Sequence, residues 1–151
     1  MTRRQLLGAI AGLPFVEMAK AANSKKGPVD TAMERGADFL LNAQQPNGAL
    51  LSKGKADTMT ALGIMALASM GHQPTDPGKF GSALSRALTF ILRKDPRRGK
   101  LEYFGADGSR MYGHGITTLC LTEMIGMVDR EQTARLREVA QKAINLILSS
   151  Q

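Results

Sequence analysis

Tryptophan is absent from this 151-residue sequence, and Phe and Tyr together bring the aromatic share to only 5%. Sites built on aromatic stacking, such as platforms for nucleic-acid bases, are therefore poorly supported. The single cysteine, Cys120, excludes an internal disulfide framework and a cysteine-rich zinc knuckle. It lies in the apolar run ITTLCLTEMIGM with no basic neighbour, so we expect a buried small hydrophobe instead of a reactive thiol.

The remaining composition is that of one globular unit. Hydrophobic residues make up 43% of the chain and charged residues 22%, and methionine is plentiful at nine. The net charge of +7 raises nucleic acid as a partner. We discount it, because the sequence has neither a recognition-helix motif nor a one-sided basic stripe with interleaved aromatics.

The N-terminus has the features of an export signal. Arg3 and Arg4 precede a short apolar segment at 6–16, and 19–21 reads Ala-Lys-Ala, the small-x-small arrangement of a cleavage site. The first residues resemble the bacterial twin-arginine motif. We therefore expect residues 1–22 to be a signal and 23–151 a mature domain in the periplasm or at the cell surface. The alternative is a frayed basic helix of a cytoplasmic protein.

Three segments of the chain, at 35–44, 86–95 and 142–151, begin alike. Each has a basic residue, a small residue and bulky apolar residues. Each ends on an amide or carboxylate, just before the loop that leads to the next helix, and we call this loop a joint. The first two copies are 51 residues apart, and between them 57–71 aligns with 112–126 at an offset of 55. The residues that mark the joints are Arg35, Phe39, Gln44, Gly48, Arg86, Phe90, Gly99, Lys142 and Gln151.

The hydrophobic pattern predicts five helices. Their expected bounds are 29–43, 57–70, 80–94, 112–126 and 130–149. The second and fourth are apolar nearly all round, which predicts an inner layer, whereas the others are amphipathic and belong outside. In the first helix Phe39 shares an apolar face with Met33, Gly36, Leu40 and Ala43. We expect Gly71 and Gly126 to end the inner helices and Asp129 to cap the last one.

The joints resemble the repeat of squalene and oxidosqualene cyclases and, more loosely, of protein prenyltransferase β-subunits. That repeat reads base, Gly or Ala, two residues, aromatic, aliphatic, three residues, Gln, a spacer and Gly-x-Trp. Leu50 and Leu101 stand where it has Trp. The resemblance implies an all-α fold of helical-hairpin repeats forming part of an α/α toroid with two concentric helix layers, here roughly two and a half repeats.

The joint residues also have a physical rationale of their own. A Gln at the end of an outer helix can offer its carbonyl to free N–H groups of a neighbouring inner helix while its NH₂ group bonds a carbonyl. Gly48 would let the chain turn back with a positive φ.

Catalytic residues of that family are not recognisable in this chain. The cyclase motif Asp-x-Asp-Asp is absent, and Asp76 and Asp107 read as turn residues. The relatives that bind zinc use an Asp, a Cys and a His, but His114 and Cys120 would lie on opposite faces of one helix. We expect neither a metal site nor a cofactor.

The candidate binding residues lie at the start of the fourth helix and in the basic loop before it. They are Tyr112, His114, Arg97, Arg98 and Lys100. In a toroid this helix start would point into the cavity mouth, and the basic run would favour an anionic group. The alternative is that the two ring residues pack and cap the helix while the loop is solvated.

Three functions are compatible with the sequence. The first is an exported binding or scaffold module for an apolar or isoprenoid-like ligand or a partner protein. The second is a fragment of a cyclase-like or prenyltransferase-like enzyme whose catalytic residues lie outside this chain. The third is a small repeat protein that self-associates or pairs with another chain to complete its toroid.

Overall fold

The computed structural model describes residues 26–50 and 54–151. The expected export signal, with Arg3 and Arg4, lies outside the described residues. Among the helices described, none has both the length and the apolar character needed to cross a membrane.

The described residues are helical, as expected. The five α-helices begin and end within three residues of the expected bounds, and two short 3₁₀ helices in the loop before the fourth were not expected. The elements are α3 (Pro28–Ala43), α4 (Ala56–Ser69), α5 (Lys79–Leu92), η1 (Pro96–Arg98), η2 (Phe104–Asp107), α6 (Arg110–Glu123) and α7 (Arg130–Ser149).

The chain divides into two units between Glu34 and Arg35, and only 26–34 of the first unit are described. The boundary falls within α3. In the first unit, Lys26 pairs with Glu34, and the Asp30 carboxylate accepts a hydrogen bond from the backbone N–H of Gly27 at 2.7 Å.

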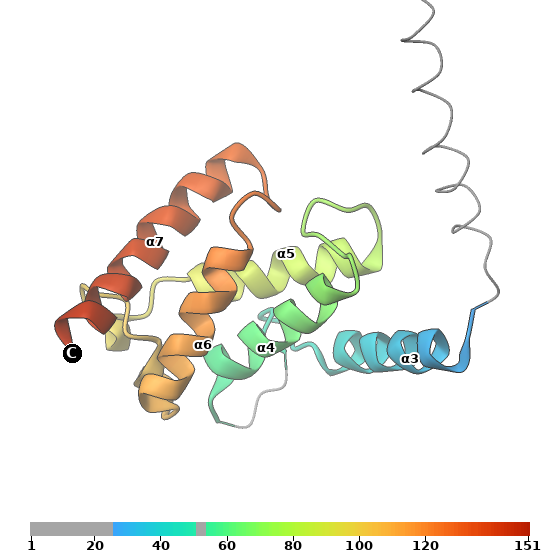
Figure 1. Cartoon of the computed structure of the whole chain (residues 1–151), viewed down its shortest axis with the longest axis horizontal. Helices are drawn as coiled ribbons and strands as arrows, with labels where there is room; N and C mark the ends of the chain where they lie inside the picture. The colour runs from blue at the N-terminus through green and yellow to red at the C-terminus, as the bar shows by residue number, and fades with distance from the viewer. Residues whose placement is uncertain (1–25, 51–53) are drawn as a thin grey trace, which may run out of the picture. The chain divides into compact units, whose positions relative to one another are not determined.

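The two apolar helices α4 and α6 pack against each other, while α5 contacts α4 and α7 contacts α6 (Figure 1). The first turns of α4 and α6 come very close. A Cβ atom on Gly113 would lie 2.2 Å from the Thr58 hydroxyl, so a side chain there would push the helices apart. Ile64, Leu67 and Leu121 are fully buried between these elements, each stabilising the fold by roughly 1.5–3 kcal/mol.

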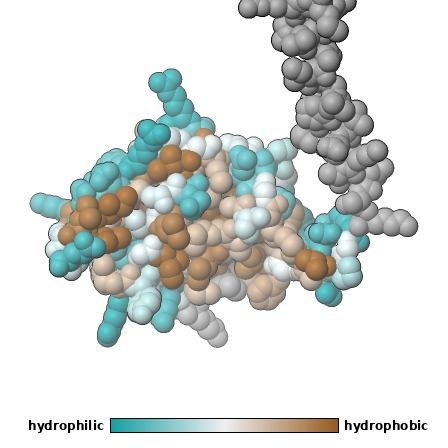
Figure 2. Space-filling view, in the orientation of Figure 1, coloured by the Kyte–Doolittle hydropathy of each residue, from teal (hydrophilic) through white to brown (hydrophobic). Residues whose placement is uncertain are grey.

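The apolar helices are not covered on every side. Leu62 on α4 is 41% exposed and Leu119 on α6 is 52% exposed. In Figure 2 hydrophobic residues gather on the surface over α6 and α7, and Leu148 near the end of α7 is 62% exposed. Among the described residues, α4 and α6 each therefore leave apolar side chains exposed, Leu62 and Leu119.

The expected helix ends are confirmed. Gly71 and Gly126 follow α4 and α6 with φ of 89° and 93°, values that favour glycine. The Asp129 carboxylate accepts a hydrogen bond from the backbone N–H of Gln132 at 2.8 Å and so caps α7.

The expected apolar face of α3 is wrong for three of its five residues, since Met33, Gly36 and Phe39 are exposed. Phe39 is 62% exposed, whereas its repeat counterpart Phe90 on α5 is 6% exposed. The residue that α3 buries is Ala37. The difference arises because the turn after α3 covers Phe90, while no described element occupies the corresponding place over Phe39.

Candidate functional site

The first joint, Gln44–Leu50, fastens the end of α3 to α5. The Gln44 amide donates to the carbonyl of Ala83 at 2.9 Å and to that of Gly48 at 3.1 Å. Its side-chain carbonyl accepts a hydrogen bond from the Arg86 guanidinium. The sequence correctly predicted that the amide group bonds a carbonyl. The prediction for the side-chain carbonyl of Gln44 was wrong. It accepts from Arg86, the basic residue of the next amphipathic helix, and not from free N–H groups of an inner helix.

Gly48 provides the close approach in this joint. Its φ is 92°, as the sequence predicted, and a Cβ there would lie 2.4 Å from the carbonyl oxygen of Arg86 and 3.4 Å from Cβ of Phe90. The turn therefore lies directly on the face of α5 formed by its base and the aromatic residue four positions later.

The second joint, Asp95–Phe104, lies near α7 without repeating this close approach, since a Cβ on Gly99 would meet nothing within 4 Å. One hollow is lined by Asp95, Gly99 and Lys142, and another by Gly99 and Leu146. Lys142 is the base of the third copy, and Leu146 stands four positions later, as Phe90 does after Arg86. The second joint thus borders hollows together with these two positions of α7, whereas the first joint packs directly on α5.

The structure also corrects the register between the copies. The backbone N–H of Leu50 donates to the Thr60 hydroxyl at 3.0 Å, and that of Phe104 donates to Nδ1 of His114 at 3.2 Å. Both donors are fully buried, and each bond spans ten residues. The counterpart of Leu50 is therefore Phe104, not Leu101, and the offset is 54, as it is between the starts of α4 and α6. Three extra residues in the second joint explain the shift.

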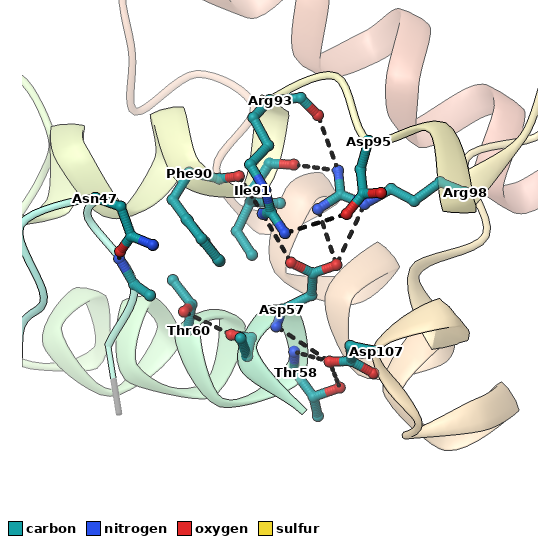
Figure 3. A network of polar contacts seen from close by, with 12 residues as sticks. Asn47, Asp57, Thr58, Thr60, Phe90, Ile91, Arg93, Asp95, Arg98 and Asp107 are labelled. Atoms are coloured by element: carbon teal, nitrogen blue, oxygen red, sulfur yellow. Dashed lines mark hydrogen bonds and ion pairs between the residues drawn. The ribbon is translucent and has the colours of Figure 1, made fainter. Parts of the chain in front are cut away.

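A buried carboxylate, that of Asp57 at the start of α4, lies between two guanidinium groups (Figure 3). It is 1% exposed, and Nη1 of Arg93 lies 2.8 Å from one of its oxygens. Arg98, itself 2% exposed, approaches the other oxygen with Nε at 3.2 Å and with Nη2 at 2.8 Å, the latter as an ion pair outside hydrogen-bond geometry. Arg98 also donates to the Ile91 carbonyl at 2.6 Å, so it satisfies the last turn of α5.

Two further carboxylates surround this cluster and are also occupied. Hydrogen bonds from the Arg97 side chain at 2.6 and 3.0 Å hold the pKa of Asp95 well below its usual range. For Asp107, burial acts to raise the pKa, but hydrogen bonds from Ser109, Thr58 and Asp57 outweigh it and lower the pKa. Asp107 caps α4 by accepting from the backbone N–H groups of Asp57 and Thr58. It also accepts a hydrogen bond from the backbone N–H of Ser109, two positions later, at 2.9 Å, which confirms its expected role as a turn residue.

His114 bridges three elements in the interior. It is fully buried, and because Nδ1 accepts from Phe104 in η2, Nε2 carries the proton and donates to the Ala143 carbonyl of α7 at 3.0 Å. Burial lowers the pKa of His114, while the bond to Ala143 partly opposes this. The imidazole is therefore neutral and has both nitrogens engaged. Cys120 is likewise buried, as expected, and burial raises the pKa of its thiol to about 12.

The five candidate binding residues are only partly brought together. Arg98 and Lys100 line one groove, whereas Tyr112 projects outward with 87% exposure. His114 lies behind the groove, its ring 5.6 Å from that of Tyr103, which lines it. Arg97 is held by Asp95 beside the groove. Within the described residues, no group of three or more His, Cys, Asp or Glu side chains could hold a metal ion.

This groove has a volume of about 710 Å³ and lies between the second joint, the first turn of α6 and the end of α7. Leu101 and Met111 present apolar surface there, at 44% and 43% exposure. The lining residues are Arg98, Gly99, Lys100, Leu101, Tyr103, Met111 and Leu146. Of the apolar lining residues, the sequence singled out Leu101, as the residue at the Trp position of the repeat, but not Met111 or Leu146.

A basic hollow of about 340 Å³ adjoins the groove, since both include Gly99 and Lys100. Lys94 and Lys142 also line it, together with the carboxylates of Asp95 and Glu102. The Asp95 carboxylate pairs with Arg93 and Arg97, and the Lys142 ammonium pairs with Glu138. Among the described residues, Lys94 and Lys100 are the lysines of the hollow without an ion pair. Apolar surface and positive charge therefore meet at Lys100.

A second apolar hollow, of about 280 Å³, lies between the ends of α4 and α6. Met65, Leu119 and Met127 line it, and Glu123 is its only charged lining residue. It offers apolar contact without a cation.

No protein-family model, no curated protein and no solved structure matches this chain.

Proposed function

We propose that this chain is a repeat module that binds an apolar ligand with an anionic head, such as an isoprenoid diphosphate. The observation that carries the proposal is the junction at Lys100 of the apolar groove with the basic hollow. A hydrocarbon tail would lie over Leu101, Met111 and Leu146, and the head would meet Lys94 and Lys100. Burying the tail supplies the affinity, and the ammonium groups orient the ligand.

We further propose that the helices form part of an α/α toroid like that of squalene cyclases and protein prenyltransferases. Two observations support this. The apolar helices α4 and α6 lie side by side with α5 and α7 packed against them, and the two joints make equivalent contacts at an offset of 54. In such a layer the open sides of α4 and α6, with Leu62 and Leu119, would face the central cavity.

Binding is tested by calorimetry with three probes: farnesyl diphosphate, farnesol and inorganic pyrophosphate. We expect farnesyl diphosphate to bind at least about tenfold more tightly than either half alone, because only it engages both surfaces. If pyrophosphate binds as tightly as farnesyl diphosphate, the apolar groove does not contribute to binding. If farnesol binds as tightly as farnesyl diphosphate, the lysines do not contribute.

Two variants locate the site. Lys100→Glu is expected to weaken farnesyl diphosphate by about tenfold and farnesol little, whereas Leu101→Asp weakens both. Arg137→Glu on α7, which reverses an exposed charge outside the groove, is the matched control. Equal affinities of the Lys100 and Arg137 variants would overturn the proposal.

A further inference from the structure

Three methionine side chains line the hollow between the ends of α4 and α6. Met65 belongs to α4, Met124 directly follows α6, and Met127 lies in the turn after it. Three of the chain's nine methionines thus gather around one space of about 280 Å³. This hollow shares no lining residue with the apolar groove, so it is a separate site that does not depend on the ligand proposed above.

A tight turn holds two of these side chains together. The backbone N–H of Met127 donates to the carbonyl of Met124 at 3.0 Å, and Gly126 between them has a φ of 93°. The Cα atoms of residues joined by such a turn are less than about 7 Å apart. Met65 faces the same space from α4, which packs against α6. Because methionine has three rotatable side-chain bonds, thioethers that start this close can be directed at one point.

Burial and charge around the three thioethers suit a cation that prefers sulfur. Met124 is fully buried, and Met65 and Met127 are half-buried. Glu123 is the only charged residue among the described residues that line the hollow, and it has no ion-pair partner among them. A carboxylate beside the sulfur atoms would offset the charge of a bound cation.

We propose that this hollow binds Cu(I) through the thioethers of Met65, Met124 and Met127. Thioethers are soft, polarisable ligands that select Cu(I), whereas Mg²⁺, Ca²⁺ and Mn²⁺ prefer the oxygen atoms of carboxylates, carbonyls and water. A thioether is neutral, so three of them leave the ion its single positive charge, which Glu123 offsets. Leu119 adds apolar surface at the wall of the hollow.

Competition between the full chain and bicinchoninate, a chromophoric Cu(I) chelator, tests the site under anaerobic reducing conditions. We expect the wild-type chain to take a single Cu(I) from the chelator. Met65→Leu, Met124→Leu and Met127→Leu should each weaken binding at least about tenfold, because leucine keeps the apolar volume and removes one ligand. Met59→Leu is the matched control and should bind as the wild type does, since Met59 is also half-buried on α4 but does not line the hollow.

Cys120→Ala distinguishes thioether from thiol ligation. Cys120 is fully buried one turn before Met124 and does not line the hollow, so this variant should retain wild-type affinity for Cu(I). X-ray absorption at the copper edge should show sulfur neighbours in the wild type and in Cys120→Ala.

Four results would each overturn the proposal. They are a wild-type chain that takes no Cu(I), equal affinities of Met59→Leu and the three leucine variants of the hollow, loss of binding in Cys120→Ala, and a copper environment of nitrogen or oxygen alone. Circular dichroism of each variant separates loss of the metal site from loss of the fold.

Discussion

At the scale of single residues, glycine is required at position 48 for two reasons that can be tested separately, its positive φ and the lack of space for a Cβ atom. Its φ of 92° strains any other residue, and a Cβ there would also overlap the Arg86 carbonyl at 2.4 Å. Gly71 has a similar φ of 89°, but a Cβ there meets nothing within 4 Å. The pair therefore distinguishes backbone strain from steric overlap.

We expect Gly48→Ala to lower the free energy of unfolding by about 2–4 kcal/mol and Gly71→Ala by about 1–2 kcal/mol, the cost of the left-handed backbone alone. Urea unfolding of both variants measures the difference. If both variants lost the same free energy of unfolding, the turn could move away from α5 without cost. The close packing of the first joint would then not contribute to stability.

Asp57 is the residue whose removal should destabilise the fold most. It neutralises the guanidinium of Arg98, which is 2% exposed and has no other carboxylate within ion-pair distance among the described residues. Asp57→Ala leaves that charge buried and is expected to cost about 3–5 kcal/mol. Glu138→Ala breaks the exposed pair with Lys142 and should cost less than about 1 kcal/mol. If Asp57→Ala and Glu138→Ala lowered the free energy of unfolding by similar amounts in thermal or urea unfolding, Asp57 would not be neutralising a buried charge.

At the scale of elements, His114 links α6, η2 and α7, and it makes this linkage sensitive to pH. Because burial places its folded-state pKa below the ordinary value of 6.5, the unfolded chain binds the proton more readily. The stabilisation is therefore complete above pH 6.5 and is lost as the pH falls below it toward the folded-state pKa.

We expect the free energy of unfolding to fall between about pH 7.5 and 5.5 in the wild type and to fall less in His114→Asn. His72→Asn controls for removing a histidine, since His72 stacks on Phe80 at the surface turn after α4. A wild-type stability that does not change over this interval, or a decline that persists in His114→Asn, would rule out this role.

The elements also show what local patterns can predict. The helices and their glycine ends were predictable because periodicity and turn chemistry are encoded within a few residues, as at Gly71 and Asp129. The burial of Arg98 was not, because its partner Asp57 is 41 residues away in the sequence. One signal was present: a lone carboxylate opening an otherwise apolar helix indicates a buried cation nearby.

At the scale of the whole chain, the repeat was recognisable but its register was not. Phe104 takes the place of Leu50 only because three residues of the second joint are accommodated before the bond to His114. Sequence spacing alone favoured Leu101, which retains the regular interval but is 44% exposed. The groove could not be predicted either, since it combines Leu101, Met111 and Leu146 from three separate elements. Only the packing of α6 and α7 brings them together.

The bonds from Leu50 to Thr60 and from Phe104 to His114 also bear on how the chain reaches this fold. Each closes a loop of only ten residues, so forming it costs little chain entropy. A joint and the helix after it can therefore assemble before the neighbouring repeat exists. Folding then has two equivalent starting points, and the remaining interfaces are added between units that are already ordered.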